Sequence, residues 1–155
     1  MYNLYRFSPI KDAKTLEDAL FYTAKELEKL SEKLIGEKLP IVSLKLFPHY
    51  PDEYDYLFSL ISKIGPKSKY TSQTSFYVDV DRKVNEYQIK LLGLRIVDPY
   101  RMQVGCGDYE VDKFQEFRSR HVSLPFVRDI IKYPNMLEIW HPDFDVLGYI
   151  IPHLK

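Results

Sequence analysis

The sequence has little of several features that would narrow its class. Its 155 residues include one cysteine, Cys106, which cannot form a disulfide within the chain. Basic and acidic residues are equal at 22 each, so no net charge would attract nucleic acid or an anionic membrane. The chain has no apolar run near the roughly 18 residues of a membrane span and does not open on a secretory signal pattern. We therefore expect a cytoplasmic protein with no membrane partner, and we disfavour nucleic acid as a partner.

Aromatic side chains, in contrast, are abundant. The chain has 13 tyrosines and 9 phenylalanines but one tryptophan. A tyrosine combines an apolar ring with a polar tip, so it suits the wall of a ligand cavity as well as a protein interface. Composition therefore leaves both small-molecule binding and self-association open.

The pattern of apolar residues predicts a single domain over residues 1–155. Three parts follow one another: residues 1–40 (an N-terminal strand or arm plus a helix), 41–98 (a first unit) and 99–155 (a second unit). In both units a strand precedes a helix and further strands, so the order of elements repeats at about 50 residues. The repeat predicts an α+β fold whose mostly antiparallel, curved sheet carries helices on one face. Paired βαβββ units are one arrangement that would produce it.

Three helices are expected. Thr15 can cap the first turn of a helix at 15–35, in which leucines recur at helical intervals. Pro51 suits the first turn of a second helix at 51–64. Asp112 is the expected cap of a third, short helix.

Seven segments have the alternation or the apolar character of strands. A hairpin is expected around residues 82–85, and a further turn at Pro134 and Asn135. The expected strands are at 41–47, 75–81, 86–98, 99–111, 126–133, 136–141 and 146–151.

Two stretches of the second unit resemble a known family. They are GDYEVDKFQEF, which contains Tyr109-Glu110-Val111-Asp112, and NMLEIWHPDFDVLGYI, which contains Leu137-Glu138-Ile139-Trp140-His141-Pro142-Asp143. Both are similar to strands of the vicinal oxygen chelate superfamily, which includes glyoxalase, bleomycin-resistance protein and extradiol dioxygenase. The resemblance implies two βαβββ units that form a cup, often around a divalent metal ion held by histidine and glutamate.

The metal ligands that the resemblance implies are Glu138, His49 and Gln103. Glu138 matches the family's final glutamate ligand. Gln103 or Cys106 stands where the family has a second histidine, and His49 ends the first unit's first strand instead of opening it. The first unit is also one strand short of the family's pattern.

Glu138 shares a strand face with Met136 and Trp140, and two interpretations of this placement stay open. The carboxylate could point into a cavity walled by these large side chains and hold a ligand or metal. It could instead lie on the exposed face of an edge strand, opposite an arginine or lysine.

Other residues have similar pairs of interpretations. Cys106, between two glycines, could be a nucleophile or a small core residue. Arg95 and Arg101 could form an anion or carboxylate pocket, whereas Tyr100 and Met102 in the same stretch suit self-association. His49 precedes a helix whose free amides could bind an anion, although a structural role is the commoner one.

The leading interpretation is a small-molecule-binding protein, with a metal-dependent enzyme of the vicinal oxygen chelate type as its catalytic form. Whether the chain is an enzyme is left open. We predict five ligand-binding residues: Glu138, Trp140, Tyr109, Arg101 and Cys106. The alternatives are a non-catalytic homodimeric interaction module and, third, a protein that binds single-stranded nucleic acid through stacked aromatic side chains.

Overall fold

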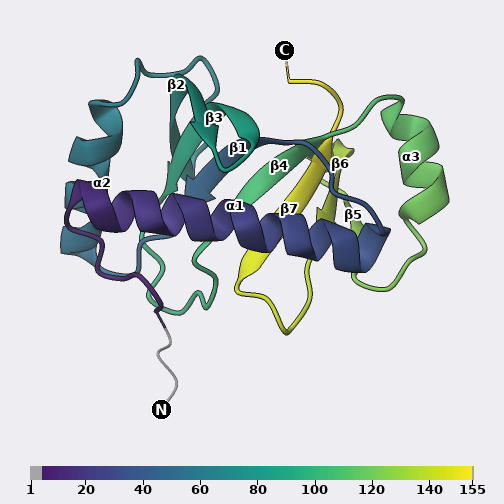
Figure 1. Ribbon diagram of the computed structural model, residues 1–155, viewed down its shortest axis with the longest axis horizontal. Coiled ribbons are helices and arrows are strands. Elements are labelled where there is room, and N and C mark those ends of the chain that lie inside the picture. Colours follow the sequence, from purple (N-terminus) through teal and green to yellow (C-terminus); the bar gives the residue numbers. More distant parts are fainter. Residues whose placement is uncertain (1–4, 155) are drawn as a thin grey trace.

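A computed structural model describes residues 5–154 of the chain (Figure 1). Seven strands form one sheet in the order β2-β3-β1-β4-β7-β6-β5. The N-terminal strand or arm expected at the start of the chain lies partly outside the described residues, and the described part, residues 5–12, forms no strand. In chain order the elements are α1 (Ala13–Ile35), β1 (Ile41–Leu46), α2 (Pro51–Ser62), β2 (Ser75–Val84), β3 (Tyr87–Arg95), β4 (Gly105–Glu110), α3 (Phe114–His121), β5 (Val127–Ile130), β6 (Tyr133–Ile139) and β7 (Val146–Ile151).

The fold is α+β as expected, but the sheet is mixed. β1 pairs with β3 and β4 pairs with β7 in parallel, whereas the other neighbouring strands run antiparallel. The prediction of a mostly antiparallel sheet was wrong because alternation along a strand does not encode the direction of its neighbour. That direction depends on the connection between the strands, and parallel neighbours need a crossover connection.

The repeated order of elements corresponds to two adjoining parts of the sheet. The second unit runs β4-α3-β5-β6-β7 with strand order β4-β7-β6-β5, and the first runs β1-α2-β2-β3 with strand order β1-β3-β2. In each unit the last strand lies parallel to the first. The two units meet where β1 pairs antiparallel with β4.

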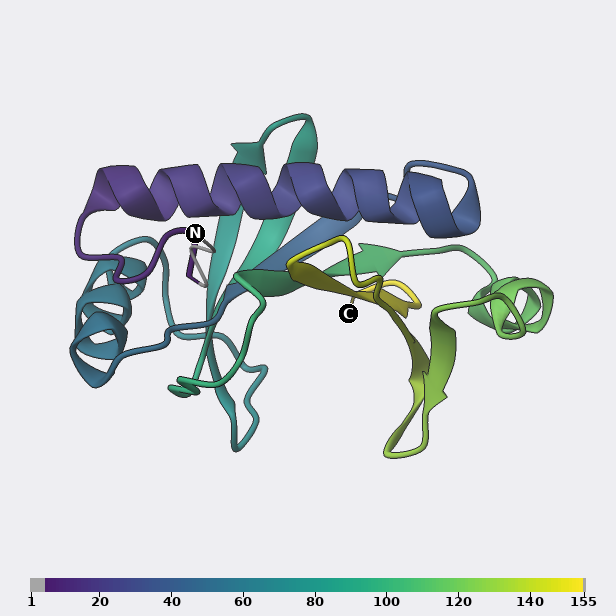
Figure 2. The same ribbon diagram turned by 90° about the horizontal axis from the view of Figure 1, so that it is seen from below.

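Helix α1 crosses the sheet over both units (Figures 1 and 2) and contacts β1, β4 and β7. Its N-cap is Asp12, whose carboxylate accepts a hydrogen bond from the Thr15 backbone N–H at 2.7 Å, so the cap precedes the predicted Thr15. The helix ends at Gly36, whose φ of 95° favours glycine. The leucines of its inner face, including Leu27 and Leu30, are fully buried. Burial of this face stabilises the helix on the sheet.

Two turns and the N-cap of α3 lie at other residues than those predicted. The β2–β3 hairpin turns at residues 85–86, where Asn85 has a φ of 56° that asparagine tolerates. The β5–β6 hairpin turns before Tyr133, so Pro134 lies within β6. Its missing N–H is tolerated because the pairing of β5 with β6 is irregular in this region. The N-cap of α3 is Lys113 rather than Asp112.

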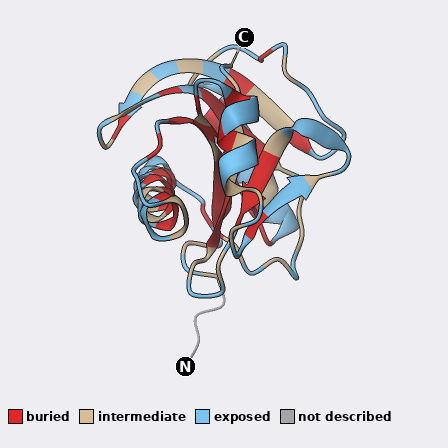
Figure 3. Cartoon of the chain, turned by 90° about the vertical axis from the view of Figure 1, so that its right-hand side faces the viewer, coloured by how far each residue is buried: buried red, intermediate tan, exposed pale blue. Residues whose placement is uncertain are grey.

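The two faces of the sheet differ in chemistry. Leu44, Leu46 and Tyr109 belong to a core cluster that includes the buried apolar residues of α1. Figure 3 shows the buried residues of the helices and of the sheet in red. On the opposite face a small cluster of Phe47, Cys106 and Leu147 is surrounded by polar side chains. Figure 2 shows β5 and β6 bending away from α1, toward the side of the sheet on which these polar side chains lie.

Candidate functional site

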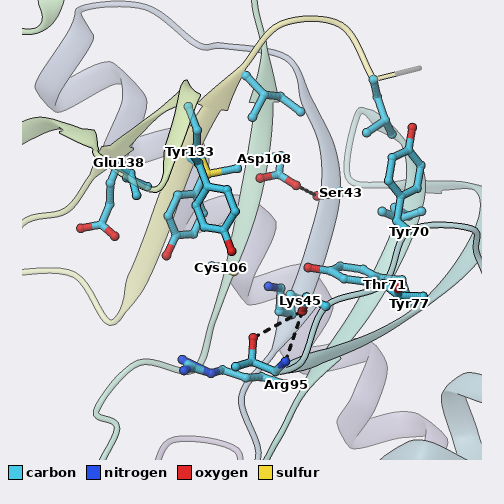
Figure 4. A pocket seen from close by; sticks show the side chains of 18 of the residues that line it. Ser43, Lys45, Tyr70, Thr71, Tyr77, Arg95, Cys106, Asp108, Tyr133 and Glu138 are labelled. Atoms are coloured by element: carbon cyan, nitrogen blue, oxygen red, sulfur yellow. Dashed lines mark hydrogen bonds between the residues drawn. The ribbon is translucent and has the colours of Figure 1, made fainter.

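A pocket of about 570 Å³ lies on the sheet face opposite α1 (Figure 4). Both units contribute to it: β1, β2 and β3 from the first, and β4, β5, β6 and β7 from the second. Four tyrosines from different parts of the chain line it, namely Tyr70, Tyr77, Tyr133 and Tyr149. The volume lies within the roughly 300–1,000 Å³ range of small-molecule sites in proteins.

Strand alternation places the floor of the pocket. In β1 the apolar Leu44 faces α1, so its neighbours Ser43 and Lys45 face the pocket. In β4 the same alternation turns Cys106 and Asp108 to the pocket. The two central strands therefore present polar side chains on a sheet whose other face is apolar.

Gly93 lets one of the four pocket tyrosines, which together we call the tyrosine wall, approach β3 closely. A Cβ atom at this position would lie 2.7 Å from the Tyr77 ring and 3.0 Å from the Lys45 side chain. A larger residue would push one of these groups aside. The absence of a side chain at Gly93 thus keeps Tyr77 and Lys45 in place at the pocket.

Three cationic side chains line the pocket. The Lys45 Nζ atom is 5.1 Å from the Tyr77 ring centre. The guanidinium carbons of Arg95 and Arg101 are 5.7 and 5.2 Å from the centre of the Phe47 ring. These distances are typical of cation–π contacts, and the shared ring makes the two arginines neighbours. Burial alone would lower the pKa of Lys45, but the nearby Cys106, Tyr77 and Asp108 groups outweigh it and raise this pKa. Lys45 is therefore an ammonium ion at neutral pH.

The acid on the pocket floor is Asp108. Its carboxylate accepts a short hydrogen bond from the Ser43 hydroxyl. Removal from bulk water raises the pKa of Asp108, although the Ser43 hydrogen bond and the charge of Lys45 act in the opposite direction. Asp108 is therefore easier to protonate than an exposed aspartate.

Glu138 combines features of its two interpretations. It lines the pocket next to Met136 and is only 8 % exposed. It also has an arginine directly across the β5–β6 pairing: Arg128 donates from Nε to the Glu138 Oε1 atom at 2.7 Å, and its Nη2 atom contacts the same oxygen. Much of the charge of Glu138 is therefore balanced before any ligand arrives.

Two of the predicted ligand-binding residues lie outside the pocket. Tyr109 is fully buried on the α1 side, where its hydroxyl donates to the Leu27 carbonyl oxygen at 2.5 Å. Alternation in β4 explains this, because Asp108 takes the pocket side. Trp140 follows the end of β6, so the strand's alternation no longer fixes its direction. Its ring meets that of Phe126 edge-on at 5.3 Å. Arg101, Cys106 and Glu138 do line the pocket.

The three predicted metal ligands are not brought together. Glu138 lines the pocket, whereas His49 and Gln103 do not. The His49 ring is held elsewhere: its Nδ1 atom is 2.7 Å from the Ser8 hydroxyl and its Nε2 atom is 2.7 Å from the Arg101 carbonyl oxygen. Within residues 5–154, no group of three or more histidine, cysteine, aspartate or glutamate side chains could hold a metal ion.

Cys106 is buried, and burial raises the pKa of its thiol to about 12. The thiolate is the reactive form, and at pH 8 very little of a thiol with such a raised pKa is ionised. We therefore expect 5,5′-dithiobis(2-nitrobenzoic acid) to modify the native protein far more slowly than the urea-unfolded chain at pH 8. Adding Ser119→Cys, on the exposed side of α3, should supply one rapidly modified thiol as a control. Rapid modification of native Cys106 would restore the nucleophile interpretation.

Several pocket residues were missed from the sequence. Lys45, Asp108 and Tyr149 lie on β1, β4 and β7 and face the pocket, yet none was predicted. A signal was present in IVSLKLF, where a serine and a lysine alternate with apolar residues as Glu138 does in its strand. By contrast, Tyr70 lies in the loop before β2, and no local pattern indicates its position. Tyr100 and Met102 are 90 % and 63 % exposed, and self-association through them remains a prediction.

Comparison with known proteins gives a fold but no family. No model of a known protein family matches the chain, and no curated protein is similar to it. One solved structure, of a structural-genomics protein named EC4020, aligns with 99 % of this chain and 92 % of its own, with a TM-score of 0.61 and 13 % identity. At this identity the likeness concerns the fold alone. No helix within residues 5–154 is long and apolar enough to cross a membrane.

Proposed function

We propose that this protein binds a small organic molecule in the pocket opposite α1. The observation that carries the proposal is the pocket itself, about 570 Å³ in volume and lined by tyrosines and polar groups from both units. Small-molecule sites are typically roughly 300–1,000 Å³, with a few polar groups that fix the orientation of the ligand. Catalysis is left open.

The order of the strands supports the resemblance to the vicinal oxygen chelate superfamily. The second unit has the βαβββ order of that family, with its last strand beside its first. The first unit has one strand fewer. We therefore propose a binding protein built on a cup of this type, and the proposal rests on the arrangement of elements rather than on family motifs.

The side chains of the pocket do not fit the divalent metal ion that the resemblance implies. Metal sites of that kind need about three nitrogen, oxygen or sulfur ligands close together. Here the pocket carries Lys45, Arg95 and Arg101, whose positive charges would repel a cation. The proposed function therefore contains no metal-dependent step.

A blocked pocket tests the proposal. Thr71 lies on the exposed rim of the pocket, so Thr71→Trp should fill the entrance at little cost to folding. We expect compounds from a library of fragment-sized molecules to raise the melting temperature of the wild type by a few degrees, because a ligand that binds the native state stabilises it. Thr71→Trp should abolish these shifts.

The matched control is Ser59→Trp, which adds the same side chain on an exposed position of α2 away from the pocket. It should respond to ligands as the wild type does. The proposal is wrong if no compound stabilises the wild type, or if both variants respond alike.

A further inference from the structure

Three cationic side chains converge at one end of the pocket from separate segments. Lys45 of β1 is paired with Gly93 of β3, and Arg95 follows Gly93 by two residues along β3. Because side chains two residues apart in a strand point the same way, Lys45 and Arg95 project from the same face of the sheet (Figure 4). Arg101 comes from the connection between the units and shares the Phe47 ring with Arg95. Such a convergence of like charges is unfavourable unless something balances it.

The described residues provide little to balance these charges. Within residues 5–154, Lys45 and Arg95 form no salt bridge, and Arg101 lies only within 3.7 Å of Asp98. The Nε atoms of Arg95 and Arg101 are both buried without a hydrogen-bond partner. A buried donor left in this state costs free energy that an acceptor from a ligand would recover.

The two acids of the pocket are already engaged. Arg128 holds the Glu138 carboxylate, and the Ser43 hydroxyl holds that of Asp108. Burial raises the pKa of Asp108, whereas the Ser43 hydrogen bond and the charge of Lys45 lower it, so Asp108 balances part of the charge of Lys45. The end of the pocket at Lys45, Arg95 and Arg101, which we call the cationic end, therefore carries three positive charges, more than Asp98 and Asp108 can balance.

We infer that the ligand of this pocket is an organic carboxylate, with its carboxylate group at the cationic end and an apolar body against the tyrosine wall. Guanidinium groups match the planar carboxylate in geometry. The rings of Tyr77, Tyr133 and Tyr149 and the side chains of Leu91 and Met136 provide contact for an apolar body. A doubly charged phosphate is less suited, because Asp108 on the same pocket floor would repel its two charges more strongly than the single charge of a carboxylate. This inference rests on the proposed function.

Binding of matched probes tests it. Benzoate and 4-phenylbutyrate would be compared with benzamide and 4-phenylbutyramide by isothermal titration calorimetry, because each pair differs mainly in charge. We expect at least one acid to bind about tenfold or more tightly than its amide. Salt at about 0.5 M should lower the affinity for the acid. The loss should be smaller than at an exposed site, because partly buried charges are screened less.

Substitution of the arginines localises the effect. Arg95→Met and Arg101→Met should each weaken binding of the acid by about tenfold or more while leaving the amide unchanged. Arg95→Lys, which keeps the charge, should recover part of the loss. Arg82→Met is the control, since Arg82 pairs with Glu17 of α1 away from the pocket. Circular dichroism would verify that each variant is folded.

The outcomes separate the two claims. If the amides bind as tightly as the acids and Thr71→Trp abolishes both, the pocket binds small molecules but the carboxylate inference is wrong. If a short oligothymidylate binds with a steep salt dependence and no acid binds, the inference is wrong in favour of nucleic acid. If no small molecule binds at all, the proposed function fails together with the inference.

Discussion

Replacement of Tyr109 by alanine is expected to lower the free energy of unfolding by about 3–5 kcal/mol. The Tyr109 side chain is fully buried between β4 and α1. Removing it leaves a cavity that the surrounding helix and strands can close only in part. Urea denaturation followed by circular dichroism would measure the change.

Tyr109→Phe is the matched control. It removes only the hydroxyl that donates to the Leu27 carbonyl oxygen. We expect a loss of about 1 kcal/mol, because the ring stays packed. If Tyr109→Ala instead kept the stability of the protein and removed ligand binding, Tyr109 would belong to the site, as its sequence context suggested.

The second large effect is expected at Glu53. Its carboxylate is fully buried and accepts two backbone hydrogen bonds at 2.7 Å, from the N–H of Ile10 and from the N–H of His49. Glu53→Ala leaves both donors buried without a partner, so we expect a loss of about 3 kcal/mol in the free energy of unfolding. Denaturant titration at neutral pH would measure it.

The neighbouring Asp52 provides the control. It is exposed, reaches Lys11 at 3.5 Å and accepts a hydrogen bond from the Glu53 backbone N–H at 3.0 Å in the first turn of α2, so Asp52→Ala should lower the free energy of unfolding by less than about 1 kcal/mol. Glu53→Ala should also weaken carboxylate binding, since His49 contacts the Arg101 backbone and would lose its anchor. Equal stability of the two variants would show that the buried carboxylate is not needed.

Local signals in the sequence were sufficient to predict the positions of most helices and strands. The α1 helix ends where the leucine pattern ends, at Gly36, and β7 spans the predicted residues 146–151. These elements have a clear period and a clear stop signal. The turns were less predictable: Pro134 looked like a turn but lies in β6, because irregular pairing removes the need for its N–H.

The site was only partly predictable for a different reason. Arg95 and Arg101 stand close together in the sequence, so a shared anion pocket could be suggested, and the structure places both at one cavity. Lys45 lies about 50 residues away from them, and its place beside Arg95 depends on the parallel pairing of β1 with β3. No local pattern specifies that pairing. Trp140 was wrongly expected in the pocket, because β6 ends at Ile139 and Trp140 therefore lies beyond the strand.

The seam between β1 and β4 has a consequence for cooperativity. The cationic end belongs to the first unit and to the connection that follows it, whereas Tyr133 and Tyr149 belong to the second. Neither unit alone could enclose a ligand, so a ligand bound in the pocket would contact both units and stabilise their pairing. Backbone amides along the β1–β4 ladder should then exchange hydrogen for deuterium more slowly in the bound protein than in the free one.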